Sequence, residues 1–192
     1  RRSRGATAAL SWQRPRARNA IVLRAGAQLE TRDYAADSDE LLAALGPFFS
    51  RVRTLPALFA TISASNSQRP SRSISPEDGV AGYVQGEQRW ERGVRGSAYG
   101  RVTGALSGYK SLDLPGFAHH VLALRAAGGW TDSPDGTELS IGGTSGEAVA
   151  VAGTTLGGRR QFPVRGYERG ALSGTRAVAL SAEYRAPAFM PA

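Results

Sequence analysis

The chain of 192 residues contains no cysteine, two histidines and a single methionine. The absence of cysteine excludes disulfide bonds, thiol nucleophiles and cysteine-ligated zinc, and two histidines leave little for a histidine-based metal centre. Long apolar runs are also missing, because stretches such as Ala20 to Leu23 fall far short of the roughly 20 residues of a membrane-spanning helix. A strand of a membrane barrel needs only roughly 9–11 residues of alternating character, so the lack of long apolar runs does not exclude a membrane β-barrel.

The chain carries more basic than acidic residues, but the basic residues are not concentrated in one segment. The chain has 24 basic residues against 16 acidic ones, and all of the basic ones except Lys110 are arginine. The arginines are scattered along the chain rather than gathered in one stripe, so we expect no nucleic-acid partner. Glycine, at 24 residues, argues against a helical bundle and favours strands with many turns. The start Arg1-Arg2-Ser3-Arg4 is basic but leads into no apolar core, so we expect no export signal and a beginning inside a longer protein.

Alternation with period two is the main signal in the sequence. Between Ala20 and Arg32 the odd positions carry Ile21 and Leu23, whereas the even positions carry Arg24 and Glu30. Successive side chains of a strand point to opposite faces, so this pattern predicts strands with one apolar and one ionic face. Seven segments follow it: Ala6 to Arg14, Ala20 to Arg32, Leu58 to Ser65, Gly79 to Glu91, Ala98 to Leu112, His120 to Trp130 and Thr175 to Pro187.

The length of these strands favours a barrel over a soluble sandwich. Several have 12 or more residues, whereas strands of soluble sheets usually have about 5–6. Mixed charge on one face and small or aliphatic residues on the other suit a transmembrane barrel with a polar lumen. Short links (Pro15 to Asn19 and Asp113 to Ala118) alternate with long ones (Ala35 to Arg53 and Thr131 to Gly174), as in such barrels. We expect a helical turn or two in the Ala35 to Arg53 loop, a soluble sandwich being the alternative fold.

The patterns of common enzyme sites are absent. The stretch Gly142-Gly143-Thr144-Ser145-Gly146-Glu147 lacks the Gly-Lys-Ser/Thr of a phosphate loop, and Ser145 lacks the spacing of a nucleophile elbow. His119 and His120 are neighbours at a strand entrance and should point to opposite faces, which disfavours a shared metal. We therefore expect no enzymatic activity, no metal and no cofactor. Trp12, Trp90 and Trp130 fall near strand ends, as in the aromatic girdles of membrane barrels.

Several segments together carry a resemblance. Leu139-Ser140-Ile141-Gly142-Gly143 and a glycine-rich stretch precede Phe162-Pro163-Val164-Arg165-Gly166-Tyr167, and a strand with Glu183-Tyr184-Arg185-Ala186-Pro187 follows. Upstream, Ile74-Ser75-Pro76-Glu77-Asp78-Gly79 stands at a strand start. Over about residues 5 to 189 the chain resembles the barrel domain of the BamA/TamA superfamily, also called the bacterial surface antigen family. In that family a long sixth extracellular loop with a V/I-R-G-F/Y motif precedes a strand ending in E-Y-R-x-P.

The resemblance implies that this loop folds back into the lumen and that its arginine pairs with acids on the inner wall. The motif residues here are Val164, Arg165, Gly166 and Tyr167. An arginine fork in a confined, partly dehydrated lumen makes strong charge-assisted bonds, Gly166 permits a tight turn, and Tyr167 can pack its ring while its hydroxyl is bonded. The family strands that supply the main acidic partners are absent here. Glu87 and Glu183, on predicted polar faces, are the candidate lumen partners.

The resemblance also implies how much of a barrel the chain contains and what the protein does. Residues 1–192 would form one partial outer-membrane β-barrel domain, about strands six to twelve of sixteen, with the sixth loop at about 131–174. The family's polypeptide-transport-associated domains and closing strands do not occur in the sequence, so we expect a fragment. The implied function is outer-membrane protein assembly, insertion or translocation in a Gram-negative-type bacterium. Implied partners are outer-membrane lipid, unfolded outer-membrane client proteins and accessory lipoproteins. Alternatives are a passive channel or structural barrel, or a barrel that carries a fused enzyme domain.

Overall fold

The chain is described by a computed structural model, which covers residues 2–16, 18–33, 52–71, 73, 75–90, 98–112, 114–115, 119–133, 139–143, 161–162, 164–168 and 171–186. Every regular element within these ranges is a β-strand. No helix in this part of the chain is long and apolar enough to cross a membrane. The helical turns expected between Ala35 and Arg53 lie outside the described residues.

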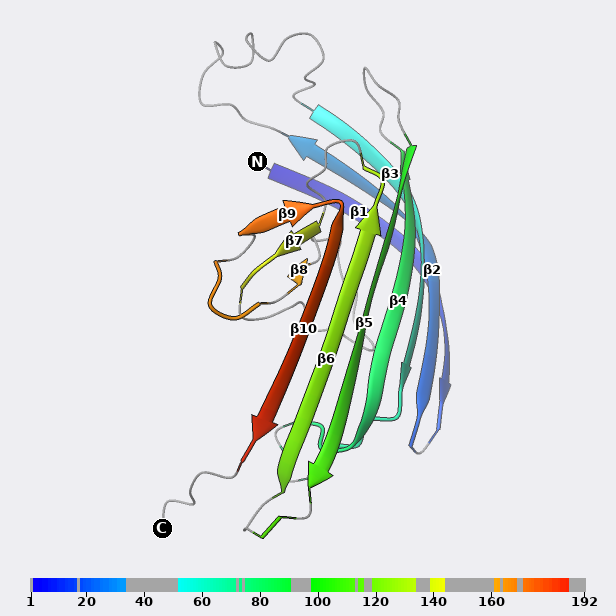
Figure 1. The fold of residues 1–192 in the computed structure, drawn as a ribbon. Coiled ribbons are helices and arrows are strands. Elements are labelled where there is room, and N and C mark those ends of the chain that lie inside the picture. The colour runs from blue at the N-terminus through cyan, green and yellow to red at the C-terminus, as the bar shows by residue number, and fades with distance from the viewer. Residues whose placement is uncertain are drawn as a thin grey trace.

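Seven long strands form one antiparallel sheet in the order β1-β2-β3-β4-β5-β6-β10 (Figure 1). The all-β prediction and all seven predicted strands are confirmed. The strands lie side by side in a single curved layer rather than in two stacked sheets. Their bounds are β1 Arg2–Pro15, β2 Ala20–Asp33, β3 Val52–Ser65, β4 Gly79–Trp90, β5 Ala98–Leu112, β6 His120–Thr131 and β10 Arg176–Arg185.

Two strands begin earlier than their patterns predict. β1 begins at Arg2 rather than Ala6, and β3 at Val52 rather than Leu58. At the start of β3, Leu55 and Ala57 are buried on the face that is polar elsewhere, so the apolar-polar contrast disappears there. Pro56 pairs with Leu29 of β2, but the pairing of β3 with β4 begins only at the next residue, so Pro56 lies where β3 has a neighbouring strand on one side only, an edge-like position that proline tolerates.

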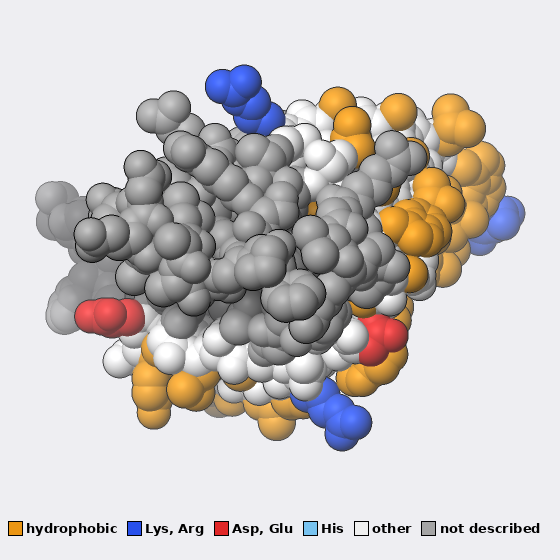
Figure 2. Space-filling view, turned by 90° about the horizontal axis from the view of Figure 1, so that it is seen from above, with side chains coloured by type: hydrophobic (Ala, Val, Ile, Leu, Met, Phe, Trp, Pro, Cys, Tyr) orange, Lys and Arg blue, Asp and Glu red, His pale blue; other side chains and the backbone are white. Residues whose placement is uncertain are grey.

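The two faces of the sheet differ in chemistry. We call the face that carries Leu10, Leu23 and Val84 the outer face and the opposite one the inner face. Hydrophobic side chains gather along the outside of the curved layer (Figure 2). They are exposed on all seven strands: Leu10, Trp12, Ile21, Leu23, Leu29, Leu58, Ile62, Val80, Val84, Trp90, Val102, Leu106, Leu122, Leu124, Trp130, Val178, Leu180 and Tyr184. The inner face carries most of the charged side chains of β2, β4 and β5, such as Glu30, Glu87 and Arg101.

A second, three-stranded sheet lies on the concave inner side (Figure 1). It consists of β7 (Leu139–Ile141) between β8 (Gln161–Phe162) and β9 (Leu172–Gly174), parallel to β8 and antiparallel to β9. The sequence pattern did not predict this sheet, because strands of two or three residues are too short to show a period. All three belong to the predicted long loop between β6 and β10, so part of that loop is ordered against the inner face.

The connections between successive strands lie at the two opposite ends of the sheet. We call the end with the links β1–β2 (16–19), β3–β4 (66–78) and β5–β6 (113–119) the turn end, and the opposite one the loop end. At the turn end, Gly79 has a φ of 96° and a Cβ there would lie 2.6 Å from the Asn66 carbonyl oxygen, so only glycine fits. The Asn66 side chain accepts a 2.6 Å hydrogen bond from the Val80 amide, which closes this link.

Candidate functional site

The segment that contains Val164 to Tyr167 is held by backbone bonds to the residues after β7. The Gly142 amide donates to the Phe162 carbonyl at 2.9 Å, and the Gly143 amide donates to the Tyr167 carbonyl at 3.1 Å. Gly143 and Val164 also form an antiparallel bridge. The two glycines have φ values of 125° and 89°, and a Cβ on Gly142 would lie 2.1 Å from the Glu168 carbonyl oxygen. Only glycine permits this close approach, so the Gly-Gly pair fixes the turn that presents Arg165.

This segment packs on a seat of small residues at the loop end of the inner face. Leu139 is fully buried and Phe162 nearly so, and they form one buried cluster with Ala127 on β6 and Ala177 and Ala179 on β10. Gly129 deepens the seat, because a Cβ there would lie 2.8 Å from the tip of the Phe162 ring. Val164 packs against the same cluster. Alanine and glycine on β6 and β10 therefore let the segment dock closely, where larger side chains would hold it away.

Arg165 follows directly in the turn and lies near β10. Its Nη2 atom lies 3.5 Å from Oε2 of Glu183, which is on the inner face. The Arg165 side chain is 76% exposed and that of Glu183 is 39% exposed, so this pair is solvent-accessible. Such pairs contribute about 0–1 kcal/mol. Gly166 has a φ of 89° with open space around it, and the Tyr167 ring is 59% exposed rather than packed.

Two of the segments that carry the resemblance meet at Arg185. Its Nη1 atom donates to the Ser75 hydroxyl in the β3–β4 link at 2.8 Å, and its Nε atom lies 3.3 Å from Glu183. The Arg185 guanidinium also lies over the Tyr109 ring, 5.9 Å from its centre. The contact joins residues that are 110 positions apart, and the sequence pattern did not predict it. Glu183 therefore serves both Arg165 and Arg185.

Glu87, the other candidate partner of Arg165, belongs to a different cluster. Its carboxylate accepts hydrogen bonds from Arg89 and from Arg101, and Arg89 Nη1 also lies 3.2 Å from Glu30 Oε2. The side chains of Glu87, Arg89 and Arg101 are at most 5% exposed. Alternating charges thus link β2, β4 and β5 across the inner face. We call this chain of four residues the buried ionic chain. It was missed because the ionic positions were visible in the sequence but the register that joins them was not.

The turn end carries a third polar cluster. Glu77 Oε2 lies 2.6 Å from His119 Nδ1, and Asp78 accepts the Ser111 amide at 3.2 Å while Lys110 Nζ lies 3.6 Å from it. The hydrogen bond with His119 holds the pKa of Glu77 below its ordinary value, more strongly than burial raises it. These contacts tie the β3–β4 link to β5 and β6. His120 instead stacks on Tyr184, with ring centres 5.8 Å apart, so the two histidines hold separate partners.

Metal and phosphate chemistry find no support in the described residues. No group of three or more potential ligands from histidine, aspartate and glutamate occurs among them. Within the Gly-rich stretch, Gly142 and Gly143 serve the backbone turn described above, and residues 144–147 lie outside the described ranges. No protein-family model matches the chain, and neither the curated proteins nor the solved structures give a match.

Glu87 and Glu183 lie on the same face, but their replacement should change the free energy of unfolding by different amounts, because Glu87 is buried and Glu183 is partly exposed. Glu87→Gln leaves Arg89 and Arg101 buried beside a neutral partner, so the free energy of unfolding should fall by about 3–5 kcal/mol. Glu183→Gln, at an exposed pair, should lower it by about 1 kcal/mol or less. Urea unfolding followed by tryptophan fluorescence measures both. Equal losses in the two variants would contradict the distinction.

The docked turn depends on Gly142 more than on Gly166. Gly142→Ala brings a Cβ against the Glu168 carbonyl, so the Gly143–Tyr167 bond should break and amide exchange over 139–143 and 161–168 should accelerate. Gly166→Ala is the matched control, because φ is positive there too but nothing lies within 4 Å of the new Cβ. It should cost only the backbone strain, about 1–2 kcal/mol. Hydrogen exchange by mass spectrometry compares them, and unchanged protection in Gly142→Ala would refute the assignment.

The Glu77–His119 contact predicts a pH dependence. Because the pKa of Glu77 is lowered on folding, the stabilisation is present above its unfolded value of about 4.5 and is lost as pH falls through the folded value. Glu77→Gln should remove this part of the acid dependence of unfolding, and His119→Phe should reduce it in the same direction. Stability measured by urea unfolding between neutral pH and pH 3 tests this. A Glu77→Gln protein with the acid dependence of the wild type would rule it out.

Proposed function

We propose that this chain is the barrel portion of an outer-membrane protein that inserts or translocates other proteins, of the BamA/TamA kind. One observation carries the proposal most directly. The Val164 to Tyr167 turn docks on the inner face of a curved sheet, with Arg165 at 3.5 Å from Glu183. Its position fits a loop that folds back into a lumen, which is the arrangement that the sequence resemblance implies.

The outer face supports a membrane setting for the sheet. Large hydrophobic side chains are exposed on all seven strands, and Leu10, Val178 and Leu180 are each more than 70% exposed. Contiguous apolar surface on this scale is rare on soluble monomers and marks contact with lipid or protein. The strands have 10 to 15 residues, whereas a tilted strand needs about 9–11 to cross a bilayer.

The positions of aromatic residues support the same setting. Trp90 and Trp130 lie on the outer face at the loop end, and Trp12 lies on the same face toward the turn end. The stacked His120 and Tyr184 are also at the turn end. Amphipathic rings at both ends of an apolar band are typical of membrane barrels, whose girdles meet the lipid headgroups.

The inner face supports a polar lumen with an anchored loop. The buried ionic chain lines one part of this face, and the seat of small residues on β6 and β10 holds the loop on another. In the proposed mechanism the anchored loop and the ionic wall steady the barrel, while a weakly paired seam offers a strand edge to an incoming client. Unpaired strand groups are a template for another strand, which makes this step physically reasonable.

Replacement of Arg165 tests the proposal. In the full-length product of the gene, Arg165→Ala should slow insertion of an outer-membrane reporter protein into vesicles about fivefold, the equivalent of about 1 kcal/mol for an exposed pair. The sheet itself should be equally stable in urea. Arg176→Ala is the matched control, because Arg176 is also exposed and near the loop end but belongs to the outer face.

The outcomes separate the alternatives. Slow insertion with Arg165→Ala and normal insertion with Arg176→Ala would support the proposal. Insertion and stability unchanged by Arg165→Ala would reject a role for the arginine. A wild-type protein that conducts ions across vesicles but inserts no client would identify a passive channel instead. A protein that stays soluble without detergent would overturn the membrane setting.

A further inference from the structure

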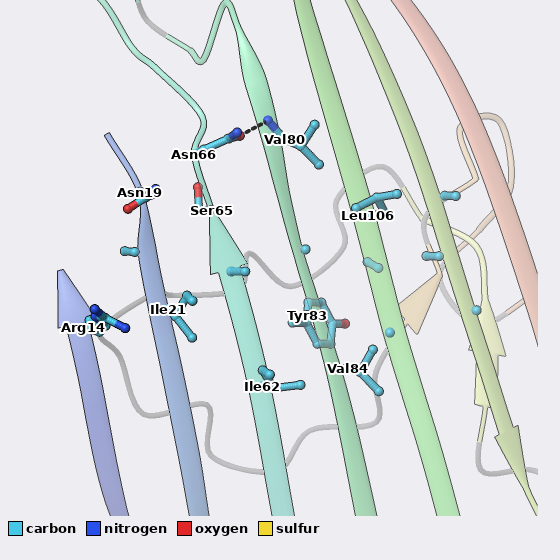
Figure 3. Close-up of a pocket in the computed structure, with 18 of the residues that line it drawn as sticks. Arg14, Asn19, Ile21, Ile62, Ser65, Asn66, Val80, Tyr83, Val84 and Leu106 are labelled. Carbon is cyan, nitrogen blue, oxygen red and sulfur yellow. Dashed lines mark hydrogen bonds between the residues drawn. The ribbon is translucent and has the colours of Figure 1, made fainter. Parts of the chain in front are cut away.

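An open hollow of about 1040 Å³ lies on the outer face of the sheet near the turn end (Figure 3). Its lining comes mainly from the apolar side chains of β2 to β6, and Arg14 and Arg16 stand at the β1 end. None of the described residues that line it is acidic. The volume is just above the range of about 300–1,000 Å³ that is typical of sites for small ligands.

Glycines form the floor of the hollow. Gly82, Gly104 and Gly128 lie on β4, β5 and β6, and Gly104 is the register partner of Gly128. Leu106 leans over Gly82, because a Cβ on that glycine would lie 3.0 Å from Leu106 Cδ1. Val84 lies over Gly104 in the same way, at 3.4 Å. Over Gly128 the space is open, with only the Ala177 carbonyl oxygen at 3.8 Å. The floor is therefore open over Gly128, whereas Leu106 and Val84 cover the other two glycines.

The hollow runs obliquely from the rim of the sheet to mid-strand. One register row joins Arg14, Ile21, Ala64, Gly82, Leu106 and Ala126 from β1 to β6. Ile21 is the second residue of β2, whereas Ala126 lies in the middle of β6. From β2 to β6 the row covers four strand spacings, about 19 Å. The row crosses the strands, so at the tilt of about 45° that is typical of membrane strands it descends about 13 Å. Half of a bilayer's hydrocarbon layer is about 15 Å, so a chain along this row would reach from headgroup depth toward the centre.

Two arginines stand at the turn-end rim of the hollow. Arg14 lies on the outer face beside Ile21 (Figure 3). Arg16 follows it in the β1–β2 link and also lines the hollow. Both side chains are exposed, and no carboxylate in the described part of the chain pairs with either. Guanidinium groups bind phosphate by paired charge-assisted hydrogen bonds. Two arginines beside an apolar channel match a molecule with a phosphate at one end and a hydrocarbon chain at the other.

We propose that this hollow binds one anionic phospholipid, with its phosphate at Arg14 and Arg16 and one acyl chain that runs across the apolar lining to the open space over Gly128. The proposal rests on the membrane setting of the proposed function. It goes further, because it assigns a specific lipid class to one place on a face that would otherwise contact bulk lipid. Because none of the described lining residues is acidic and two arginines stand at the rim, a negatively charged headgroup is favoured over a zwitterionic one.

Lipid retention tests the site. The full-length product of the gene is reconstituted in vesicles of phosphatidylcholine and phosphatidylglycerol, extracted in mild detergent, and its retained lipids are counted by native mass spectrometry. The wild type should retain phosphatidylglycerol in preference to phosphatidylcholine. In the double variant Arg14→Gln with Arg16→Gln, the ratio of retained phosphatidylglycerol to retained phosphatidylcholine should fall about tenfold, because two charge-assisted contacts are removed.

Two glycines on the same face provide a matched pair for the acyl-chain part. Gly128→Leu fills the open floor without a clash and should lower retention of phosphatidylglycerol about as much as loss of the arginines does. Gly108→Leu adds the same side chain to the outer face where nothing lies within 4 Å and outside the hollow, so it should retain lipid like the wild type.

Each result decides the proposal. Preference for phosphatidylglycerol in the wild type and in Gly108→Leu, together with its loss in the arginine variant and in Gly128→Leu, would support the lipid site. Equal retention of the two lipids by a wild type that enters vesicles overturns the lipid site and leaves the membrane setting intact. Loss in the arginine variant but not in Gly128→Leu overturns the acyl-chain position, since the headgroup alone would then be bound. A change of oligomeric state in Gly128→Leu would show that a second copy occupies the hollow instead. Failure of the wild type to enter vesicles overturns both proposals.

Discussion

The strict alternation of side chains along seven strands in continuous register is the constraint on which the rest of the structure depends. Because neighbouring strands pair residue by residue, the parity of a position fixes its face across the whole sheet. A slip of one residue in β4 would move Val84 onto the inner face and expose Glu87 and Arg89 on the outer one. The buried ionic chain opposes such a slip, since its charges are paired only in the observed register.

The inner face is divided between two kinds of surface, and the division decides where the long loop can dock. On β2, β4 and β5 the buried charges are mutually satisfied, so an apolar segment would gain little there and would compete with paired groups. Near the loop end of β6 and β10 the inward positions include Ala127, Gly129, Ala177 and Ala179, which offer apolar contact and room for Leu139 and Phe162. Packing therefore selects the place of the loop, and the Arg165–Glu183 pair sets only its final orientation, because an exposed ion pair stabilises too little to do more.

The sequence predicted those features that repeat along a strand and missed those that depend on pairing. The seven strands and the split of β2, β4 and β10 into apolar and polar faces follow from period two, which a single chain displays. The small sheet was missed because Leu139 to Ile141 is too short to show a period. The contact of Arg185 with Ser75 and the link from Glu30 to Arg101 were missed because the residues are far apart in sequence. Glu183 and Glu87 were both credible partners for Arg165, and only the docking of the loop on β6 and β10 places Glu183 near it.

β10 connects the docked loop with the turn end. Glu183 lies 3.5 Å from Arg165 of the loop and 3.3 Å from Arg185, which in turn reaches Ser75 in the β3–β4 link. A carboxylate has about four acceptor sites, so it serves both arginines without competition. Ala177 and Ala179 of the same strand carry the apolar contacts of Leu139 and Phe162. A displacement of β10 relative to β6 would therefore disturb the seat of the loop, its arginine and the link at the turn end together, whereas a displacement of β1 would disturb none of them.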